Sequence, residues 1–332
     1  MTIEIRPLDR GSDAEIRAYW EVGRDAAADR PYNQHVAWQA ASTYLRAPGT
    51  DVREVRAAAW DGDRMVGIHG LRAPLLESTD SAVVFVEVLP DHRRQGLGTA
   101  LLHHAEAAAR ELSRTVLIGW AYAPIDAESA ATAFAARHGF RIELEEGSKV
   151  LDLTAGRDRW ADLAAEVAPH HRDYRVVTLW GPVPDELMDG YCALNTAFMG
   201  EVPTGDSPVE LEQWDEARVR EREARAAKAG RRDLYTFALD ATGEVVALTE
   251  LFINTTVPHR SFQSGTLVMP GHRGHRLGLA IKLANLQALV AAYPQVEWIL
   301  TDNADVNAPM NAVNDRLGFR VVERCLEVRK EL

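Results

Sequence analysis

The chain has 332 residues, of which 46% are hydrophobic and 26% charged, and its 49 acidic and 37 basic side chains give a net charge of −12. At about 150 residues per domain, this length predicts two domains of ordinary globular composition. The acidic balance argues against a nucleic-acid partner, which needs clustered positive charge, and there is no run of about 18 apolar residues to suggest a membrane span.

The first half alternates strands with helices. In chain order, its apolar spacing predicts strand 3–7, helices 13–28 and 36–45, strands 53–60, 65–72 and 83–89, a turn over 90–96, helix 97–112, strand 115–122, helix 127–138, and strands around 141 and at 150–153. Strands that form hairpins and also alternate with helices predict an α/β (α+β) fold, with a mixed, mostly antiparallel sheet flanked by helices.

The second half repeats the first. Pro90-Asp-His-Arg and Pro270-Gly-His-Arg are 180 residues apart, and Gly139-Phe140 lies 179 residues before Gly318-Phe319. We therefore expect two copies of one domain, over 1–155 and 174–332, joined by a polar connector over 156–173. The expected elements of the second copy are strand 175–179, a charge-rich solvated helix 212–228, strands 234–239, 245–253 and 265–268, helix 277–292, strand 298–301, helix 308–317 and strand 320–328.

A glycine-containing loop joins the strand over 83–89 to the following helix. Its sequence, Arg93-Arg-Gln-Gly96-Leu-Gly98, predicts several backbone N–H groups at the positive end of a helix, which suits phosphate or pyrophosphate. A Walker-type loop is excluded because Gly98 is not followed by Lys-Ser/Thr, and a dinucleotide loop is excluded because Leu101 stands where it needs glycine. The alternative is a helix that merely begins with glycines.

Pro-x-His-Arg-x-x-Gly-x-Gly after a valine-rich strand, followed later by Gly-Phe, resembles the GNAT (GCN5-related) N-acetyltransferase superfamily. The resemblance covers both halves, as in tandem GNAT proteins such as mycothiol synthase and its actinobacterial relatives. It implies that each loop binds the CoA pyrophosphate, that the pantetheine lies beside a splayed strand, and that an amine attacks the thioester of acetyl-CoA directly. At the strand ends, the backbone N–H near Val88 or Val268 would supply the oxyanion donor. The residues implied to bind the cofactor are Val88, Arg93, Arg94, Gln95, Gly96, Leu97, Gly98 and Thr99 in the first copy and Val268, Arg273, Gly274, His275, Arg276, Leu277 and Gly278 in the second.

The two copies depart from the family pattern in complementary ways. The first keeps both loop glycines but has Glu128 and Ala135 where the family has Asn and Tyr. In the second, Arg276 replaces the first loop glycine, and we expect it to adopt the conformation of a helical first turn. Asn307 stands at the Asn position and Asn314 replaces the Tyr that would protonate the departing thiolate.

Four asparagines recur every three or four residues in the second copy, at Asn303, Asn307, Asn311 and Asn314. Because asparagine is a poor helix former, this spacing predicts a polar face turned toward a ligand, with Asn303, Asn307 and Asn314 contacting the cofactor. The alternative is a set of caps and turns around Pro309.

Glu87 and Glu250 are the candidate bases, because each interrupts an apolar strand. Such a carboxyl group is expected to have a raised pKa and to face a cleft, or else to lie at a solvated rim. The proton for the thiolate would come from water or Tyr293, or the thiolate leaves unaided. The pairs His103-His104 and His170-His171 lack the i, i+4 spacing of a zinc site and are expected at the surface, so no metal site is predicted.

These features predict an acyl-CoA-dependent N-acyltransferase that transfers acetyl to a small-molecule amine, with the chemistry in the C-terminal copy. The alternative is a non-catalytic acyl-CoA-binding protein with a sensor or regulatory role. The presence of only two cysteines, Cys192 and Cys325, fits a reducing compartment and predicts a cytoplasmic protein. No nucleic-acid or membrane partner is expected, and a homodimer is left open.

Overall fold

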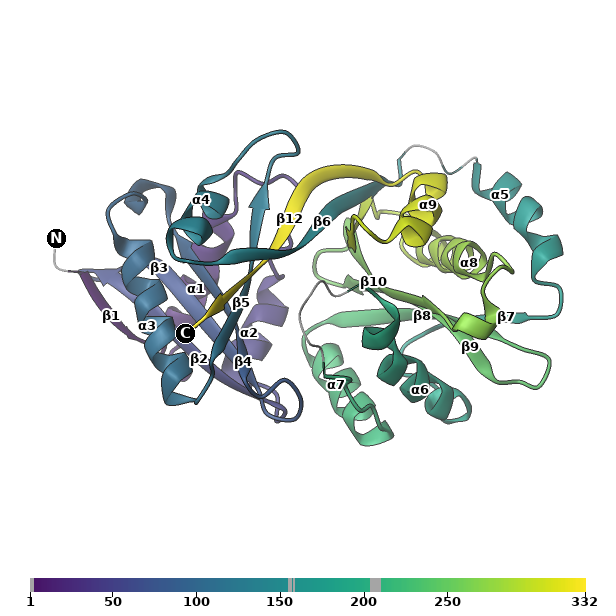
Figure 1. Ribbon diagram of the computed structural model, residues 1–332, viewed down its shortest axis with the longest axis horizontal. Coiled ribbons are helices and arrows are strands. Elements are labelled where there is room, and N and C mark those ends of the chain that lie inside the picture. Colours follow the sequence, from purple (N-terminus) through teal and green to yellow (C-terminus); the bar gives the residue numbers. More distant parts are fainter. Residues whose placement is uncertain (1–2, 155–156, 158, 204–209) are drawn as a thin grey trace. The chain divides into compact units, whose positions relative to one another are not determined.

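The computed structural model describes residues 3–154, 157, 159–203 and 210–332 (Figure 1). The chain divides into two compact units: unit 1 comprises Met1–Glu145 with Cys325–Leu332, and unit 2 comprises Glu146–Arg324. None of the helices in the described ranges is both long and apolar enough to cross a bilayer.

Unit 1 contains a mixed sheet. Its elements are β1 (Ile3–Pro7), α1 (Asp13–Ala26), α2 (Trp38–Arg46), β2 (Val52–Asp61), β3 (Arg64–Pro74), β4 (Ser81–Val88), η1 (Pro90–His92), α3 (Leu97–Glu111), β5 (Val116–Ala123) and α4 (Ala130–Arg137). The pairs β1–β2, β2–β3 and β3–β4 are antiparallel and β4–β5 is parallel. The C-terminal part of β12 (Arg320–Glu331) follows β5 in the strand order.

Unit 2 repeats this plan. After β6 (Arg141–Asp152) its elements are α5 (Arg159–Val167), η2 (Ala168–His170), β7 (Arg175–Trp180), α6 (Asp185–Glu201), α7 (Glu216–Lys228), β8 (Arg231–Leu239), β9 (Val245–Asn254), β10 (Arg260–Val268), η3 (Pro270–His272), α8 (Leu277–Ala292), β11 (Trp298–Ala304) and α9 (Ala308–Leu317). The pairs β7–β8, β8–β9 and β9–β10 are antiparallel, β10–β11 is parallel, and β11 pairs antiparallel with β6.

Two strands contribute residues to both units. The second part of β6 belongs to unit 2, whereas the last residues of β12 belong to unit 1. Each unit thus completes its sheet with a strand from the other half of the sequence. The sequence predicted domains over 1–155 and 174–332 with a connector over 156–173, and the division into units differs from these boundaries. The boundary between residues 155 and 156 lies outside the described residues. A repeat in the sequence reveals the copies but not an exchange of their last strands.

Most of the expected elements are present, but helix α6 was not predicted, β10 begins at Arg260 rather than at 265, and α7 begins at Glu216 rather than at 212. Two other differences concern the first half of the sequence. The strands expected near 141 and at 150–153 form one continuous strand, β6. Helix α4 begins at Ala130 rather than near 127 because Ser129 and Thr132 form a capping box, in which each side chain accepts a hydrogen bond from the other's backbone N–H.

Helices cover both faces of each sheet, as the strand alternation requires. In unit 1, Ala58 packs with α1 and α2 while the adjacent Ala59 packs with α3. In unit 2, Phe237 packs with α6 and α7, whereas Ala238 packs with α8. Because successive strand residues point to opposite faces, these neighbours place the early helices on one face and the loop helix on the other (Figure 1).

One glycine fixes how closely α6 packs on its sheet. A Cβ atom at Gly190 would lie 2.6 Å from the Cβ of Val245 on β9. Gly190→Ala should therefore destabilise the protein by about 1–3 kcal/mol through overpacking, although alanine favours a helix. Gly200→Ala in the same helix meets a neighbour at 3.4 Å and should be neutral or stabilising. Urea unfolding measures both, and an equal gain in the two variants would contradict this packing.

Candidate functional site

The loops that precede α3 and α8 have the same backbone conformation despite different sequences. Arg94 and Gly96 have φ of 63° and 83°, and Gly274 and Arg276 have φ of 87° and 54°. Each loop therefore has left-handed residues at the same two positions, one a glycine and the other an arginine. Arg276 does not adopt the expected conformation of a helical first turn: as the N-cap of α8 it is left-handed, which is strained for a residue with a side chain.

The first arginine of each loop braces the loop from within. Arg93 Nε donates to the carbonyl of Val88 at 3.1 Å, and its Nη2 donates to the carbonyl of Ala26 at 2.7 Å. Arg273 Nε donates in the same way to Val268 at 3.1 Å. These side chains hold the loop against the end of its strand, a role that the sequence did not predict.

The start of each helix presents backbone N–H groups. No side chain in the described residues caps the helices that begin at Leu97 and Leu277, so their first donors are available to an anion. Both leucines are buried and can offer only their backbone. The other predicted loop residues lie around them: Arg94, Gln95, Gly96, Gly274, His275 and Arg276 are exposed, Gly98 and Gly278 are half-buried, and Thr99 Oγ1 lies 3.1 Å from His138 Nε2.

An acidic side chain pairs with the loop arginine of unit 2. Glu166 of α5 forms ion pairs with both Arg276 and Arg316. The guanidinium that replaces the loop glycine is therefore held by a carboxylate beside the positive end of α8. Unit 1 has Gly96 at the corresponding position and needs no such partner.

The parallel strands diverge next to each loop. Strand β4 pairs with β5 only from Ser81 to Val83, and β10 pairs with β11 only from Arg260 to Phe262. The later residues of β4 and β10 thus turn one edge away from the neighbouring parallel strand. Such an edge can hydrogen-bond an extended ligand as a further strand.

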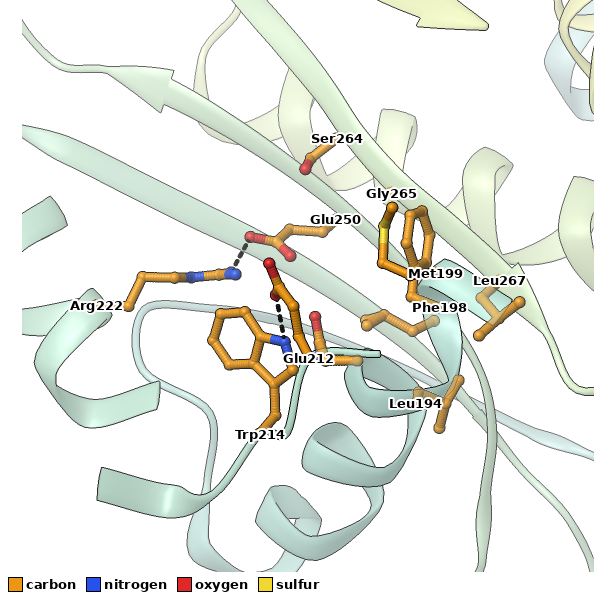
Figure 2. A pocket seen from close by; sticks show the side chains of 12 residues that line it. Leu194, Phe198, Met199, Glu212, Trp214, Arg222, Glu250, Ser264, Gly265 and Leu267 are labelled. Carbon is orange, nitrogen blue, oxygen red and sulfur yellow. Dashed lines mark hydrogen bonds and ion pairs between the residues drawn. The ribbon is translucent and has the colours of Figure 1, made fainter. Parts of the chain in front are cut away.

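Unit 2 contains a cavity of about 190 Å³ at this edge (Figure 2). It is lined by side chains from α6, the segment before α7, α7 itself, β9 and β10: Leu194, Asn195, Phe198, Met199, Glu212, Trp214, Arg222, Leu248, Glu250, Ser264, Gly265 and Leu267. The walls are mostly apolar, and two carboxylates face the space. Trp214 Nε1 donates to Glu212 at 2.9 Å, which fixes that carboxylate.

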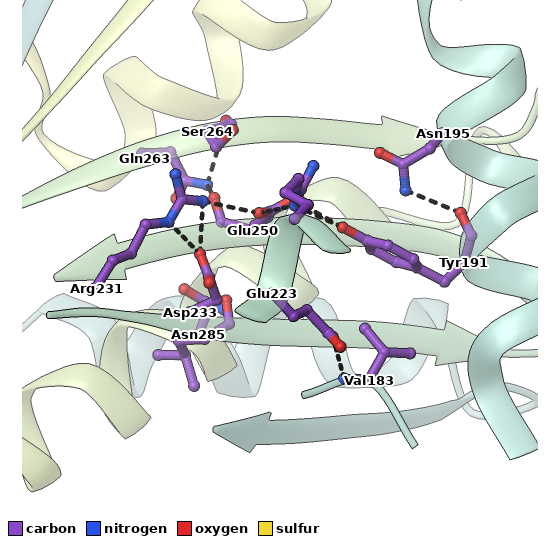
Figure 3. A network of polar contacts seen from close by, with 12 residues as sticks. Val183, Tyr191, Asn195, Glu223, Arg231, Asp233, Glu250, Gln263, Ser264 and Asn285 are labelled. Carbon is purple, nitrogen blue, oxygen red and sulfur yellow. Dashed lines mark hydrogen bonds and ion pairs between the residues drawn. The ribbon is translucent and has the colours of Figure 1, made fainter. Parts of the chain in front are cut away.

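Glu250 lies at the centre of a polar network (Figure 3). Its Oε1 accepts from Arg222 at 2.5 Å and from Arg231 at 3.2 Å, and its Oε2 lies 3.4 Å from the Tyr191 hydroxyl. The side chain faces the cavity as expected, and the two guanidinium groups engage one of its two oxygens.

A β-bulge lies opposite Glu250. The register of β10 on β9 shifts between Gln263 and Thr266, at Ser264 and Gly265, which line the cavity. Gln263 Nε2 donates to the Glu250 carbonyl at 2.6 Å and holds this irregular backbone. Bulges re-aim backbone groups next to active sites, and the two residues of this one line the cavity.

Glu87 lies in a different environment in unit 1. Burial raises the pKa of its carboxyl group to about 7, against the opposing influence of Arg30 and Arg56. Gly23 of α1 leaves room for it, since a Cβ there would lie 2.9 Å from Glu87 Oε2. The raised pKa agrees with the expectation from its apolar strand, and a carboxyl group that titrates near neutrality is suited to proton transfer.

The asparagines contact one another and neighbouring groups. Asn307 caps α9 by accepting from Met310 N at 3.3 Å, and Asn311 accepts from Lys149 Nζ at 2.5 Å. Asn314 is fully buried and accepts from Lys282 Nζ at 2.8 Å, while its Nδ2 donates to Asn303 Oδ1 at 2.5 Å. The cap at Asn307 matches the alternative of caps and turns around Pro309, and the contact of Asn314 with Lys282 was not predicted.

Two further residues lie in unexpected surroundings. Tyr293 lies at the end of α8, whose 16 residues separate it from the loop by about 24 Å, and its hydroxyl accepts from Arg232 at 3.0 Å. His104 is not a free surface residue, because its Nδ1 lies 2.8 Å from Nε2 of the buried His69. Within the described ranges, no three His, Cys, Asp or Glu side chains form a metal-binding group.

The raised pKa of Glu87 predicts that the free energy of unfolding falls as the pH rises. Between pH 4.5 and about 7 the folded state retains a proton that the unfolded state releases, so stability falls as the pH rises through this window. Glu87→Gln should therefore raise the free energy of unfolding at pH 8, by on the order of 2 kcal/mol, and change it little at pH 4. Glu4→Gln, at an exposed strand position, is the control. An equal gain in the free energy of unfolding at pH 4 and pH 8 would mean that packing, and not the charge of Glu87, causes the gain.

Comparisons with known proteins agree with this architecture. The acetyltransferase (GNAT) family model matches residues 18–140. A tandem GNAT protein from the clavulanic acid biosynthesis pathway superposes with a TM-score of 0.84 and 29% identity, over 99% of this chain and 98% of that one. A GCN5-related N-acetyltransferase from Sphaerobacter thermophilus shares the fold, with a TM-score of 0.66 and 16% identity over 99% and 95% of the chains. No curated protein matches the sequence.

The acetyltransferase (GNAT) family model thus covers part of the first half of the sequence, and the chain as a whole has the fold of a tandem GNAT protein.

Proposed function

We propose that the protein transfers an acetyl group from acetyl-CoA directly to a small-molecule amine, and that the amine binds in the cavity of unit 2. The observation that carries the proposal is the cavity's contact with the bulge of β10, at Ser264 and Gly265. An acyl donor lying along the open edge of β10 would bring its thioester to this bulge. An amine in the cavity would then face the thioester carbonyl.

The donor would be held by backbone groups. The N–H groups at the start of α3 or α8 suit a pyrophosphate, and the free edge of the preceding strand suits the two amides of pantetheine. In this arrangement the amine nitrogen attacks the thioester carbon, the carbon–sulfur bond breaks, and the electron pair remains on the sulfur. The proton that the nitrogen loses passes through solvent to the thiolate.

The cavity favours an amine with a small apolar body. A volume of about 190 Å³ corresponds to about six water molecules at their volume in the liquid. Phe198, Leu248 and Leu267 supply apolar walls, and Glu212 and Glu250 supply acceptors. Because Oε1 of Glu250 is engaged by two arginines, we assign its Oε2 to hold and orient the amine.

The alternative is a protein that binds acyl-CoA without transferring the acyl group. The ion pair of Arg276 with Glu166 at the loop of unit 2 favours it, because a resident carboxylate competes with a phosphate. Release of free CoA that depends on an added amine separates the two functions, since binding alone releases no thiol.

Valine at the second loop glycine tests cofactor binding in each unit. Gly98→Val and Gly278→Val add a branched side chain in the first turn of α3 and α8, beside the first N–H donors, so each should weaken acetyl-CoA binding to its own unit by at least about tenfold, or 1.4 kcal/mol. Titration calorimetry on the two folded variants reports the number of remaining sites. Unchanged stoichiometry and affinity in a folded variant would rule out binding at that loop.

Glutamine at the two candidate carboxylates tests where the amine reacts. Glu250→Gln removes the charge beside the cavity and should lower kcat/KM for amines by about 10- to 100-fold, with most of the loss in KM. Glu87→Gln is the matched change in unit 1. Assays of free thiol over a panel of small amines measure both, with thermal unfolding as the control for folding. Loss of turnover in Glu87→Gln with Glu250→Gln unaffected would move the chemistry to unit 1.

A further inference from the structure

Lys282 of α8 is a buried cation without an acidic partner. Its side chain is 1% exposed, and within the described ranges it forms no ion pair. Its ammonium donates to Asn314 Oδ1 at 2.8 Å and lies 5.2 Å from the centre of the Phe319 ring. A lysine buried in this way is costly unless something compensates for its desolvation, so it requires an explanation.

The chemistry of the ammonium fixes the direction of a hydrogen-bond chain. Because lysine can only donate, the oxygen of Asn314 must face Lys282. The Nδ2 of Asn314 therefore faces Asn303, whose Oδ1 accepts at 2.5 Å. Asn303 is left with its Nδ2 as the last donor of the chain, and that group has no hydrogen-bond partner among the described residues.

The chain ends where the parallel strands have separated. Asn303 lies three residues beyond Leu300, the last residue of β11 that pairs with β10, and it is half-buried. The sequence repeat also places Asn314 where the family has a tyrosine. The free amide is therefore on the diverging part of β11, the region to which the proposed function assigns the acyl donor.

We propose that Lys282 is a positioning residue that orients Asn314 and Asn303, so that the Asn303 amide donates a hydrogen bond to the sulfur of CoA as it leaves. This inference rests on the proposed function and adds to it the group that replaces the missing phenol. When the carbon–sulfur bond breaks, the electron pair stays on the sulfur, and the N–H of Asn303 stabilises the thiolate without transferring a proton. The cation at the far end polarises both amides and strengthens the final donor.

The charge on Lys282 should itself depend on pH. Burial, with a smaller contribution from Lys149 of β6, lowers the pKa of Lys282 to about 7. Asp305 and Asp315 act on Lys149, and Lys149 is the charged group that acts on Lys282 from the surrounding elements. Stabilisation of the thiolate should therefore weaken as the pH rises through 7.

The first experiment measures the thiol of bound CoA directly. In the Gly98→Val background, which restricts binding to unit 2, ultraviolet absorbance of the thiolate gives the pKa of bound CoA. We expect this pKa to lie below that of free CoA, and to rise toward the free value in both Lys282→Met and Asn303→Ala. The readout needs no amine, so a protein that turns over no amine would contradict the proposed function and leave this measurement intact.

Turnover supplies the second experiment. Lys282→Met and Asn303→Ala should each lower kcat by about 10- to 100-fold, as expected for a supporting group, and the double variant should be no worse than either one. Lys149→Met removes the positive charge that helps to lower the pKa of Lys282. This variant should keep its turnover, and the pKa near 7 in its pH profile of kcat should move to higher pH. Asn303→Ala acts at a half-buried position, so it tests the chain even if Lys282→Met does not fold.

A purely structural lysine gives a different result. Exchange of a buried cation for methionine is then neutral or stabilising, with unchanged kcat, pH profile and thiol pKa. That outcome in a folded Lys282→Met protein, or independent and additive losses from Lys282→Met and Asn303→Ala, would overturn the inference.

Discussion

The separation of two parallel strands is the constraint on which each unit depends. A sheet normally leaves no gap, because neighbouring strands satisfy each other's backbone groups. In both units the parallel pair is joined over three residues and then diverges. Backbone groups that a neighbour would have satisfied are thereby directed toward a ligand, and the helix that follows the loop brings its N–H groups to the same place. The loop, the bulge and the cavity act together because they share this edge.

The two loops show how one backbone shape survives different sequences. Each has two left-handed positions, and in each copy one is a glycine and the other an arginine. A left-handed arginine costs roughly 1–2 kcal/mol relative to the right-handed conformation, so it persists only where its surroundings hold it. Around Arg276 the surroundings include Glu166, whose carboxylate pairs with the guanidinium. Unit 1 also has one left-handed arginine, Arg94, at the other of the two positions, so the two loops differ in which position holds the strained residue.

Much of the fold could be predicted from the sequence because its signals are local. Apolar spacing defines α3 and α8 almost to the residue, and the repeated Pro-x-His-Arg reveals both loops. The exchange of last strands could not be predicted, because β6 and β12 have the same pattern whichever sheet they join. The brace by Arg93 was also missed, since its acceptors, the carbonyls of Val88 and Ala26, are backbone groups without a sequence signal.

The site was predicted less completely, because the roles of polar residues depend on neighbours far away in sequence. Glu87 and Glu250 look alike in sequence, as single carboxylates within apolar strands. Arg222 lies 28 residues before Glu250 and Arg231 lies 19 before it, and these two partners distinguish a paired carboxylate from the protonatable one in unit 1. Lys282 gave no signal at all, because a single lysine in an otherwise apolar helix is usually read as a surface position.

The repeat shows that the two carboxylates are not equivalent positions. At an offset of 180 residues, Glu87 corresponds to Leu267, which lines the cavity of unit 2, and Glu250 corresponds to Gly70. In unit 1 a Cβ atom at Gly70 would lie 2.4 Å from Nη1 of Arg56, so a guanidinium occupies the space that the Glu250 side chain enters in unit 2. Each copy thus places a carboxylate and an arginine at the same part of the sheet, but on different strands. Burial raises the pKa of the Glu87 carboxyl group to about 7, whereas Glu250 accepts hydrogen bonds from two arginines. One fold has therefore produced a group suited to proton transfer in one copy and a group suited to binding in the other.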